Sequence, residues 1–118
     1  MLFGFENETA PLSEYELYVL VPLLTRFFSS RYGEAKAVKN HNLCKKLAAK
    51  GYIATEARIR KVISHIRITG AVPCLVASSK GYFRVRPESQ TMKDYIDSLK
   101  GRELAIRAVR EAMEEQMS

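Results

Sequence analysis

The sequence of 118 residues predicts a mainly α-helical fold of the α+β class, in one domain with a single β-hairpin. Apolar residues recur at three- and four-residue spacing over most of the chain, which is the period of an amphipathic helix. Two short β-prone runs flank a turn-forming cluster near residue 79 and predict the hairpin. Apolar residues make up 47% of the chain, which is enough for a core at this length without disulfides.

The first predicted helix covers residues 13–32, after a flexible N-terminus at residues 1–12. Ser13 and Glu16 have the spacing of a capping box, in which each side chain accepts the backbone amide of the other residue. Pro22 lies inside the segment and predicts a kink, because it has no backbone donor. The helix should bury an apolar stripe made of Leu17, Leu20, Val21, Leu24, Phe27 and Phe28.

A helix-turn-helix followed by a hairpin is predicted over residues 40–86. Asn40 can cap a short second helix, and Thr55 can cap a third helix that ends at Gly70. Residues 71–77 and 82–86 predict the hairpin, with Lys80 at its tip. The apolar residues expected in the core are Leu43, Leu47, Ile59, Val62, Ile63 and Ile66.

A C-terminal helical region is predicted at residues 89–116, with a bend expected at Gly101. Pairs at i, i+4 such as Glu103 with Arg107 accompany an approximate heptad seam. A helix packed on its own domain and a helix paired with a second copy explain this seam equally well. We favour a homodimer, because the first and last helices offer more apolar surface than a small core needs. The seam consists of Tyr95, Leu99, Ile106, Val109 and Met113.

The net charge of +6 is concentrated in the middle of the chain. Residues 31–86 hold thirteen lysines and arginines but only Glu34 and Glu56 as acids, a net charge of +11. The flanking segments, residues 1–30 and 87–118, carry −3 and −2. Self-repulsion on this scale is usually tolerated for a polyanionic partner. Nucleic acid is therefore the first expectation, and an anionic membrane or an acidic protein is the alternative.

The order of helix, short helix, turn, helix and hairpin resembles that of winged helix-turn-helix proteins, and the match falls on residues 40–86. Residues 66–82 also look like small winged-helix proteins of bacterial prophages and mobile elements. The resemblance implies binding to double-stranded DNA, with the third helix in the major groove and the wing on the flanking backbone or minor groove. It further implies a transcriptional regulator, or an accessory replication factor, of a phage or mobile element.

Two sets of residues are candidates for contact with DNA. Side chains on the exposed N-terminal turns of a recognition helix reach base edges, and arginine and lysine suit the O6 and N7 atoms of guanine. Cations on neighbouring elements more often contact phosphates, which position the protein without reading sequence. The expected base readers are Thr55, Arg58, Lys61 and His65. The expected backbone contacts are Lys45, Lys46, Lys50, Arg60, Lys80, Arg84 and Arg86.

Catalysis and metal binding are not predicted. His41 and Cys44 have helical i, i+3 spacing, but no motif supplies the further ligands of a zinc site. Cys44 and Cys74 are expected to be free thiols. The sequence contains no glycine-rich phosphate loop, nucleophile elbow or paired-carboxylate motif, so we expect no enzyme activity, no cofactor and no small-molecule ligand.

The expected location is the cytoplasm, without membrane association. No apolar run approaches the roughly 18 residues that a membrane span requires. An alternative to DNA binding remains open, namely a non-catalytic protein-interaction module that uses the same fold to dock an acidic partner.

Overall fold

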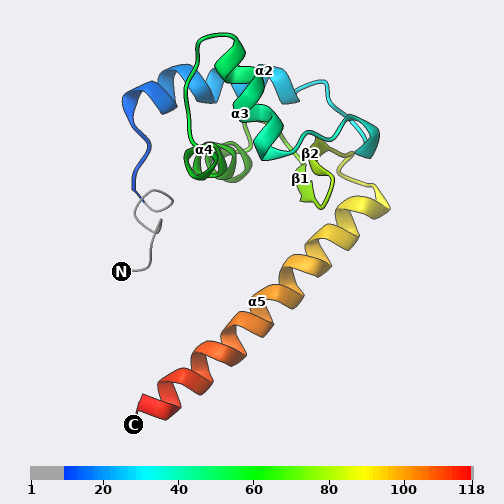
Figure 1. The fold of residues 1–118 in the computed structure, drawn as a ribbon. Coiled ribbons are helices and arrows are strands. Elements are labelled where there is room, and N and C mark those ends of the chain that lie inside the picture. Colours follow the sequence, from blue (N-terminus) through cyan, green and yellow to red (C-terminus); the bar gives the residue numbers. More distant parts are fainter. Residues whose placement is uncertain (1–9, 118) are drawn as a thin grey trace. The chain divides into compact units, whose positions relative to one another are not determined.

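The computed structural model describes residues 10–117, which are mainly helical with one small antiparallel sheet (Figure 1). The predicted class, mainly α with a β-hairpin, is confirmed at this level. The chain divides into two compact units, residues 1–85 and 86–118, and each is described by itself. Residues 1–9, part of the predicted flexible N-terminus, lie outside the described residues.

The N-terminal helix begins with the predicted capping box. The Ser13 amide donates to the Glu16 carboxylate at 2.8 Å, and the Glu16 amide donates to the Ser13 hydroxyl at 3.1 Å. At the expected kink the helix widens into a π-helical turn, η1 (Glu16–Leu20), in which the Val21 amide donates to the Glu16 carbonyl. This turn directly precedes Pro22, near the start of α2 (Val21–Phe28), and π turns and prolines are both common causes of helix kinks.

The first helix ends earlier than predicted, at Phe28 rather than at residue 32. The reason is a contact with the sheet, because Tyr32 forms a parallel bridge with Arg84 and the Gly33 amide donates to the Arg84 carbonyl at 2.9 Å. A short 3₁₀ turn, η2 (Glu34–Lys36), follows. Residues beside the hairpin are therefore extended or turned, and they cannot continue the helix.

Helices α3 (Asn40–Ala49) and α4 (Glu56–Thr69) form the predicted helix pair (Figure 1). Thr55 caps α4 as expected, since its hydroxyl accepts a hydrogen bond of 3.2 Å from the Arg58 amide. Gly70 ends the helix in the left-handed conformation. The predicted cap of α3 is wrong. Asn40 is the first helical residue, and its side-chain amide donates instead to the Glu56 carbonyl at 2.8 Å, which ties the start of α3 to the start of α4.

The hairpin consists of β1 (Leu75–Ser78) and β2 (Gly81–Arg84), paired antiparallel with Leu75 opposite Arg84. On the other edge of β2, Val38 pairs antiparallel with Tyr82 through two backbone hydrogen bonds of 3.1 and 2.9 Å. Strand β2 therefore lies between β1 and the segment that precedes α3. Lys80 lies in the turn of the hairpin, as predicted.

A single core cluster joins the first helix, α3, α4 and the hairpin. All six core residues predicted on α3 and α4 are buried. Three residues of the predicted first-helix stripe, Leu20, Leu24 and Phe28, are buried as well, and Leu17, Val21 and Phe27 are half-buried. Leu12 also packs against this cluster, so the predicted flexible N-terminus ends before residue 12.

The C-terminal unit contains α5 (Gln90–Met117), which passes through Gly101 without interruption. The expected bend at Gly101 is therefore wrong. Glycine lowers helix propensity by about 1 kcal/mol but keeps its backbone donor, so it weakens a helix without having to break it. Several apolar side chains of α5 are exposed, among them Leu99, Ile106 and Val109. Among residues 10–117, no helix is both long and apolar enough to cross a membrane.

Replacing Gly81 with alanine should strongly destabilise the N-terminal unit. Gly81 has φ of +119°, and a Cβ there would overlap the carbonyl group of Val38 and lie 2.7 Å from the Lys39 amide nitrogen. We expect a loss of about 3 kcal/mol in the free energy of unfolding, from steric overlap added to backbone strain. Gly51→Ala is the matched control, because Gly51 also has a positive φ but no neighbour within 4 Å, so its cost should be about 1 kcal/mol. Urea denaturation of both variants measures the difference, and equal losses would contradict the close approach.

Candidate nucleic-acid interface

The outer surface of α4 is the centre of the candidate interface. Ile59, Val62, Ile63 and Ile66 point into the core, which turns the opposite side of the helix outward. Ser64 is exposed there, and Ile68 is 83% exposed. Lys61 and His65, both predicted base readers, are half-buried on the same outer surface.

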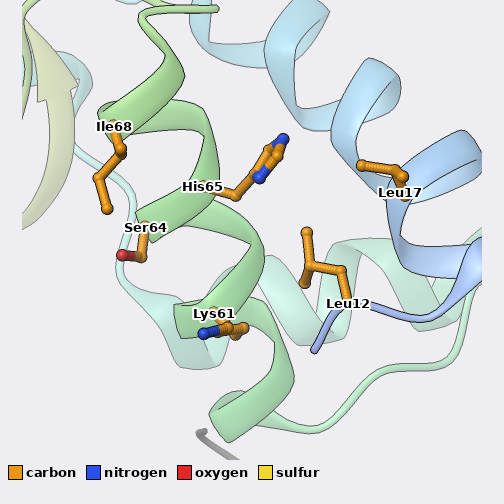
Figure 2. A pocket seen from close by; sticks show the side chains of 6 residues that line it. All are labelled: Leu12, Leu17, Lys61, Ser64, His65 and Ile68. Carbon is orange, nitrogen blue, oxygen red and sulfur yellow. The ribbon is translucent and has the colours of Figure 1, made fainter. Parts of the chain in front are cut away.

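A shallow groove of about 330 Å³ lies between this surface and the start of the N-terminal helix. Figure 2 shows Leu12 and Leu17 on one side and the α4 residues on the other, with the imidazole of His65 pointing toward Leu17. The groove combines apolar walls with cationic and polar groups. Its lining residues are Leu12, Leu17, Lys61, Ser64, His65 and Ile68.

Arg58 does not have the free guanidinium that the base-reading prediction requires. Its Nε and Nη2 atoms donate to the two carboxylate oxygens of Glu16, each at 2.6 Å. Its Nη1 and Nη2 atoms donate to the carbonyls of Ala10 and Pro11 at 3.1 and 2.9 Å. The two side chains are only 16% and 8% exposed. Arg58 therefore joins α4 to the N-terminal segment, and we remove it from the candidate base readers.

The Glu16–Arg58 ion pair changes the titration of both groups. Hydrogen bonding from Arg58 is the main reason that the pKa of Glu16 falls to about 2, against the opposing effect of burial. The same hydrogen bond raises the pKa of Arg58. The pair is therefore charged on both sides at neutral pH, with its charges directed at each other.

The two lysines of α3 and Lys50, which follows its last residue, remain available at the surface. Lys45, Lys46 and Lys50 are all exposed, and α3 contains no acidic residue. Arg60 of α4 is exposed as well. Residues 1–85 together carry a net charge of +7, so these side chains project from a strongly cationic unit.

The hairpin contributes fewer available cations than predicted. The Lys80 ammonium lies 3.2 Å from the Glu34 carboxylate, but both side chains are more than half exposed. Arg84 donates to the carbonyls of Pro73 and Ser29 at 3.0 and 2.7 Å, and its guanidinium lies 4.6 Å from the centre of the Tyr32 ring. Arg84 thus connects structural elements, which reduces its capacity for a phosphate contact.

Thr55 and Arg86, two further residues predicted to contact DNA, are both exposed. Thr55 is exposed, but its hydroxyl oxygen accepts the Arg58 amide as the cap of α4. The hydroxyl hydrogen is still available to a phosphate or base acceptor. Arg86 is exposed and is the first residue of the C-terminal unit.

Sequence reasoning missed Glu16 as a determinant of this surface. Its role in the capping box was recognised, but Arg58 follows 42 positions later, and no helical or strand period connects the two. It also did not single out Lys39, which is exposed and directly precedes α3. The only available signal for Lys39 was the charge excess of residues 31–86.

No metal or redox site stands out in the described part of the chain. Within it, no group of three or more His, Cys, Asp or Glu side chains could hold a metal ion. Cys44 and Cys74 are free thiols, and burial raises the pKa of Cys44, which makes its reactive thiolate scarcer at neutral pH.

Glu16→Gln should lower stability at neutral pH and remove part of its acid dependence. Because the pKa of Glu16 in the folded protein is about 2, against an ordinary value of 4.5, its contribution is complete above pH 4.5 and is lost as the pH falls toward 2. We expect the variant to lose roughly 2–3 kcal/mol in the free energy of unfolding at pH 7, and the difference from wild type to shrink below pH 4.5.

Glu14→Gln is the matched control, because Glu14 is exposed in the same first turn and its removal should change stability by no more than about 0.5 kcal/mol. Urea denaturation at several pH values measures both variants. Equal stability of Glu16→Gln and wild type at pH 7 would contradict the assigned role of the pair.

Comparisons with known proteins yield no relative of this chain. No family model, no curated protein and no solved structure matches it. The function is therefore inferred from the charge and geometry of the chain's own residues.

Proposed function

We propose that this protein is a non-catalytic, winged-helix protein that binds double-stranded DNA. The order of α3, α4 and the hairpin supports the proposal, because it is the order of a helix-turn-helix followed by a wing. Helix α4 is the recognition helix, and α3 crosses the DNA backbone. The hairpin is the wing.

The attachment of the hairpin supports the same arrangement. The pairing of Val38 with Tyr82 fixes β2 to the segment immediately before α3. Arg84 adds hydrogen bonds to Ser29 and Pro73. A wing attached along its β2 edge keeps a fixed position relative to the start of α3, and a surface that follows a DNA duplex requires such a fixed position.

The observation that carries the proposal is the surface of exposed lysines on α3 next to a recognition helix with few acids. Lys45, Lys46 and Lys50 make phosphate contacts, and Arg60 and Lys80 extend them. Lys61 and His65 are the remaining candidates for base contacts. Because Arg58 is ion-paired with Glu16, contacts to phosphates supply most of the affinity for DNA. Discrimination between DNA sequences is therefore modest.

The biological role that fits this proposal is that of a transcriptional regulator, or an accessory replication factor, of a phage or mobile element. It rests on the resemblance of residues 66–82 to small proteins of such elements. Both roles require that the protein bind duplex DNA in the cytoplasm, and neither requires a cofactor or a small-molecule ligand.

The groove beside α4 favours a second candidate, a protein-interaction module that docks an acidic partner. Its lining combines the apolar side chains of Leu17 and Ile68 with the polar groups of Lys61 and His65, which suits an acidic peptide with apolar side chains. A pure protein-docking module should show no affinity for duplex DNA.

Titration of random-sequence duplex DNA by fluorescence anisotropy at several salt concentrations tests the proposal. About five phosphate contacts predict a slope near −4.5 for log affinity against log salt concentration. Lys45→Ala should weaken binding to all sequences alike and reduce this slope by about 1, whereas Lys61→Ala should cost roughly 1–3 kcal/mol and relax one base position of a selected site.

Lys93→Ala is the matched control, since Lys93 is an exposed lysine of α5 outside the proposed surface. Its removal changes the net charge as much as Lys45→Ala does, yet it should leave the affinity nearly unchanged. Absence of duplex binding at low salt would refute the DNA proposal and favour the protein-docking module.

We further propose that α5 pairs two copies of the protein through its seam. Ile106, Val109 and Met113 are 69%, 61% and 51% exposed, and Leu99 is 41% exposed, at the spacing of a helical seam. A two-fold dimer of this kind presents two α4 helices, which is how helix-turn-helix dimers read paired half-sites.

Ile106→Asp should convert the dimer to a monomer, because a carboxylate at the centre of the seam would be desolvated without a partner. Leu104→Asp is the matched control, since Leu104 is 61% exposed but lies two residues away, on the opposite side of α5. Light scattering coupled to size exclusion should give twice the chain mass of 13.4 kDa for wild type and Leu104→Asp, and the mass of one chain for Ile106→Asp. A monomeric wild type would contradict the pairing.

A further inference from the structure

One step of the apolar seam on α5 is occupied by a charged residue. The helical spacing that leads from Leu99 to Ile106 passes through Arg102, which lies on the same side of the helix. All three side chains are exposed. Because a guanidinium inside a helix–helix interface needs a compatible neighbour, Arg102 restricts the ways in which a second copy can lie along α5.

A parallel pair of α5 helices would place like charges against each other. In a parallel pair in register, each seam residue faces the same residue of the other helix. Arg102 would then face Arg102 of the partner subunit between two apolar steps. Two guanidinium groups repel each other, and the repulsion grows as the surrounding water is excluded. The seam therefore opposes parallel pairing at its centre.

An antiparallel pair in which the two helices overlap over the whole of Gln90–Met117 avoids this contact. In that register, Leu99 faces Val109 of the partner subunit. Arg102 faces Ile106 of the partner subunit, so its aliphatic stem covers an apolar side chain while its guanidinium extends to the solvent. The charged step thus meets an apolar step instead of a second charge.

A hollow on α5 fits this register. It has a volume of about 430 Å³ and is lined by Ala105, Ile106, Val109 and Arg110. Because Leu99 of the partner subunit faces Val109, its side chain enters the hollow, in the way that a knob enters a hole between paired helices. The hollow is thereby filled by a side chain of complementary, apolar character.

Charged residues beside the seam are complementary in the antiparallel pair. Glu103 and Arg110 are exposed on one edge of the seam, two turns apart, whereas the other edge carries the small residues Ser98, Ala105 and Ala112. Unlike edges meet in a parallel pair, but like edges meet in an antiparallel pair. Glu103 of each copy therefore lies beside Arg110 of the other copy, which gives two symmetry-related ion pairs.

The direction of the side chains favours these ion pairs. Side chains on a helix lean toward its N-terminus. In the antiparallel pair this turns each Glu103 toward Arg110 of the partner subunit, and it turns the two copies of Glu103 away from each other. Arg110 also donates to Glu114 of its own chain at 2.6 Å, but both side chains are more than half exposed. A guanidinium has five donors, so one arginine serves both carboxylates.

We propose that two copies of α5 pair antiparallel over the full length of the helix, with Arg102 against Ile106 of the partner subunit. This orientation rests on the proposed dimer and specifies its interface. The two Gln90 ends, at which the helices begin, are then about 40 Å apart, against about 10 Å in a parallel pair. One turn of duplex DNA measures about 34–36 Å, so the antiparallel pair suits half-sites on separate turns.

Disulfide cross-linking of full-length variants tests the orientation. Tyr95→Cys and Met113→Cys are each made in a background of Cys44→Ala/Cys74→Ala, which removes the native thiols. Tyr95 faces Met113 of the partner subunit in the antiparallel pair, so a mixture of the two variants should form a linked dimer on mild oxidation. Tyr95→Cys alone should remain unlinked, because its two copies lie about 27 Å apart, beyond the reach of a disulfide.

Two cross-linking results would overturn the orientation. Linking of Tyr95→Cys to itself would show a parallel pair. Absence of linking in the mixture, with a wild-type dimer in light scattering, would place the interface on another face or in another register.

Charge exchange tests the two ion pairs without cysteines. Glu103→Arg and Arg110→Glu should each raise the dissociation constant of the dimer about 5- to 30-fold, because two attractions become two repulsions. An equimolar mixture of the two variants should restore the dimer mass, since opposite charges then face each other again. Effects within one chain cannot produce such a recovery on mixing.

Asp97→Arg and Lys100→Glu are the matched control pair for this exchange. Both residues are exposed on the side of α5 opposite the seam, and the substitutions change the charge by the same amounts. Each control variant should remain a dimer. Dimers of Glu103→Arg and Arg110→Glu as stable as wild type, or an equal loss and recovery in the control pair, would contradict the proposed ion pairs.

These measurements contain no DNA, so their outcome is separate from that of the anisotropy titration. A monomeric wild type would refute both the dimer and its orientation and would leave DNA binding by single copies intact. Antiparallel cross-linking without duplex binding would support the interface and refute the DNA proposal.

Discussion

The ion pair between Glu16 and Arg58 is the constraint on which the N-terminal unit depends. Glu16 starts the first helix through its capping box and also begins the π turn before Pro22. Arg58 lies in the first turn of α4 and holds the carbonyls of Ala10 and Pro11. One guanidinium with several fixed donors thus joins three segments, as a lysine ammonium would not in the same geometry. The core residues Ile59, Val62 and Ile66 orient α4, and the ion pair fixes its first turn to the N-terminal segment.

The basic residues of this unit have two different roles, internal hydrogen bonding and exposure of positive charge at the surface. Arg58 and Arg84 donate to carbonyls and carboxylates inside the unit, and Arg31 donates to the Lys36 carbonyl and lies 4.5 Å from the centre of the Phe27 ring. The lysines of α3 are exposed instead. Planar guanidinium groups satisfy several acceptors at once, whereas ammonium groups act as hydrated point charges. The composition counts both as basic residues, yet Arg58, Arg84 and Arg31 are bound within the unit, whereas Lys45, Lys46, Lys50 and Arg60 are exposed at its surface.

Sequence reasoning was most successful where the controlling interactions are local. The capping box at Ser13, the cap at Thr55 and the end of α4 at Gly70 involve residues within four positions of each other, and the structure has all three. The core seam of α4 follows from its helical period. Long-range contacts caused the errors, since Asn40 bonds to Glu56 rather than capping its own helix. The sheet contacts of Tyr32 and Gly33 shorten the first helix, and the partner of Arg58 is 42 positions away.

The loss of Arg58 as a base reader changes what kind of DNA recognition the unit can perform. Thr55 shares its oxygen with the helix cap, and Lys61 and His65 are half-buried beside the groove. Ser64 and Ile68 are more exposed than either, and they offer a hydroxyl and a methyl-rich surface to base edges. Such contacts discriminate bases weakly compared with a bidentate arginine.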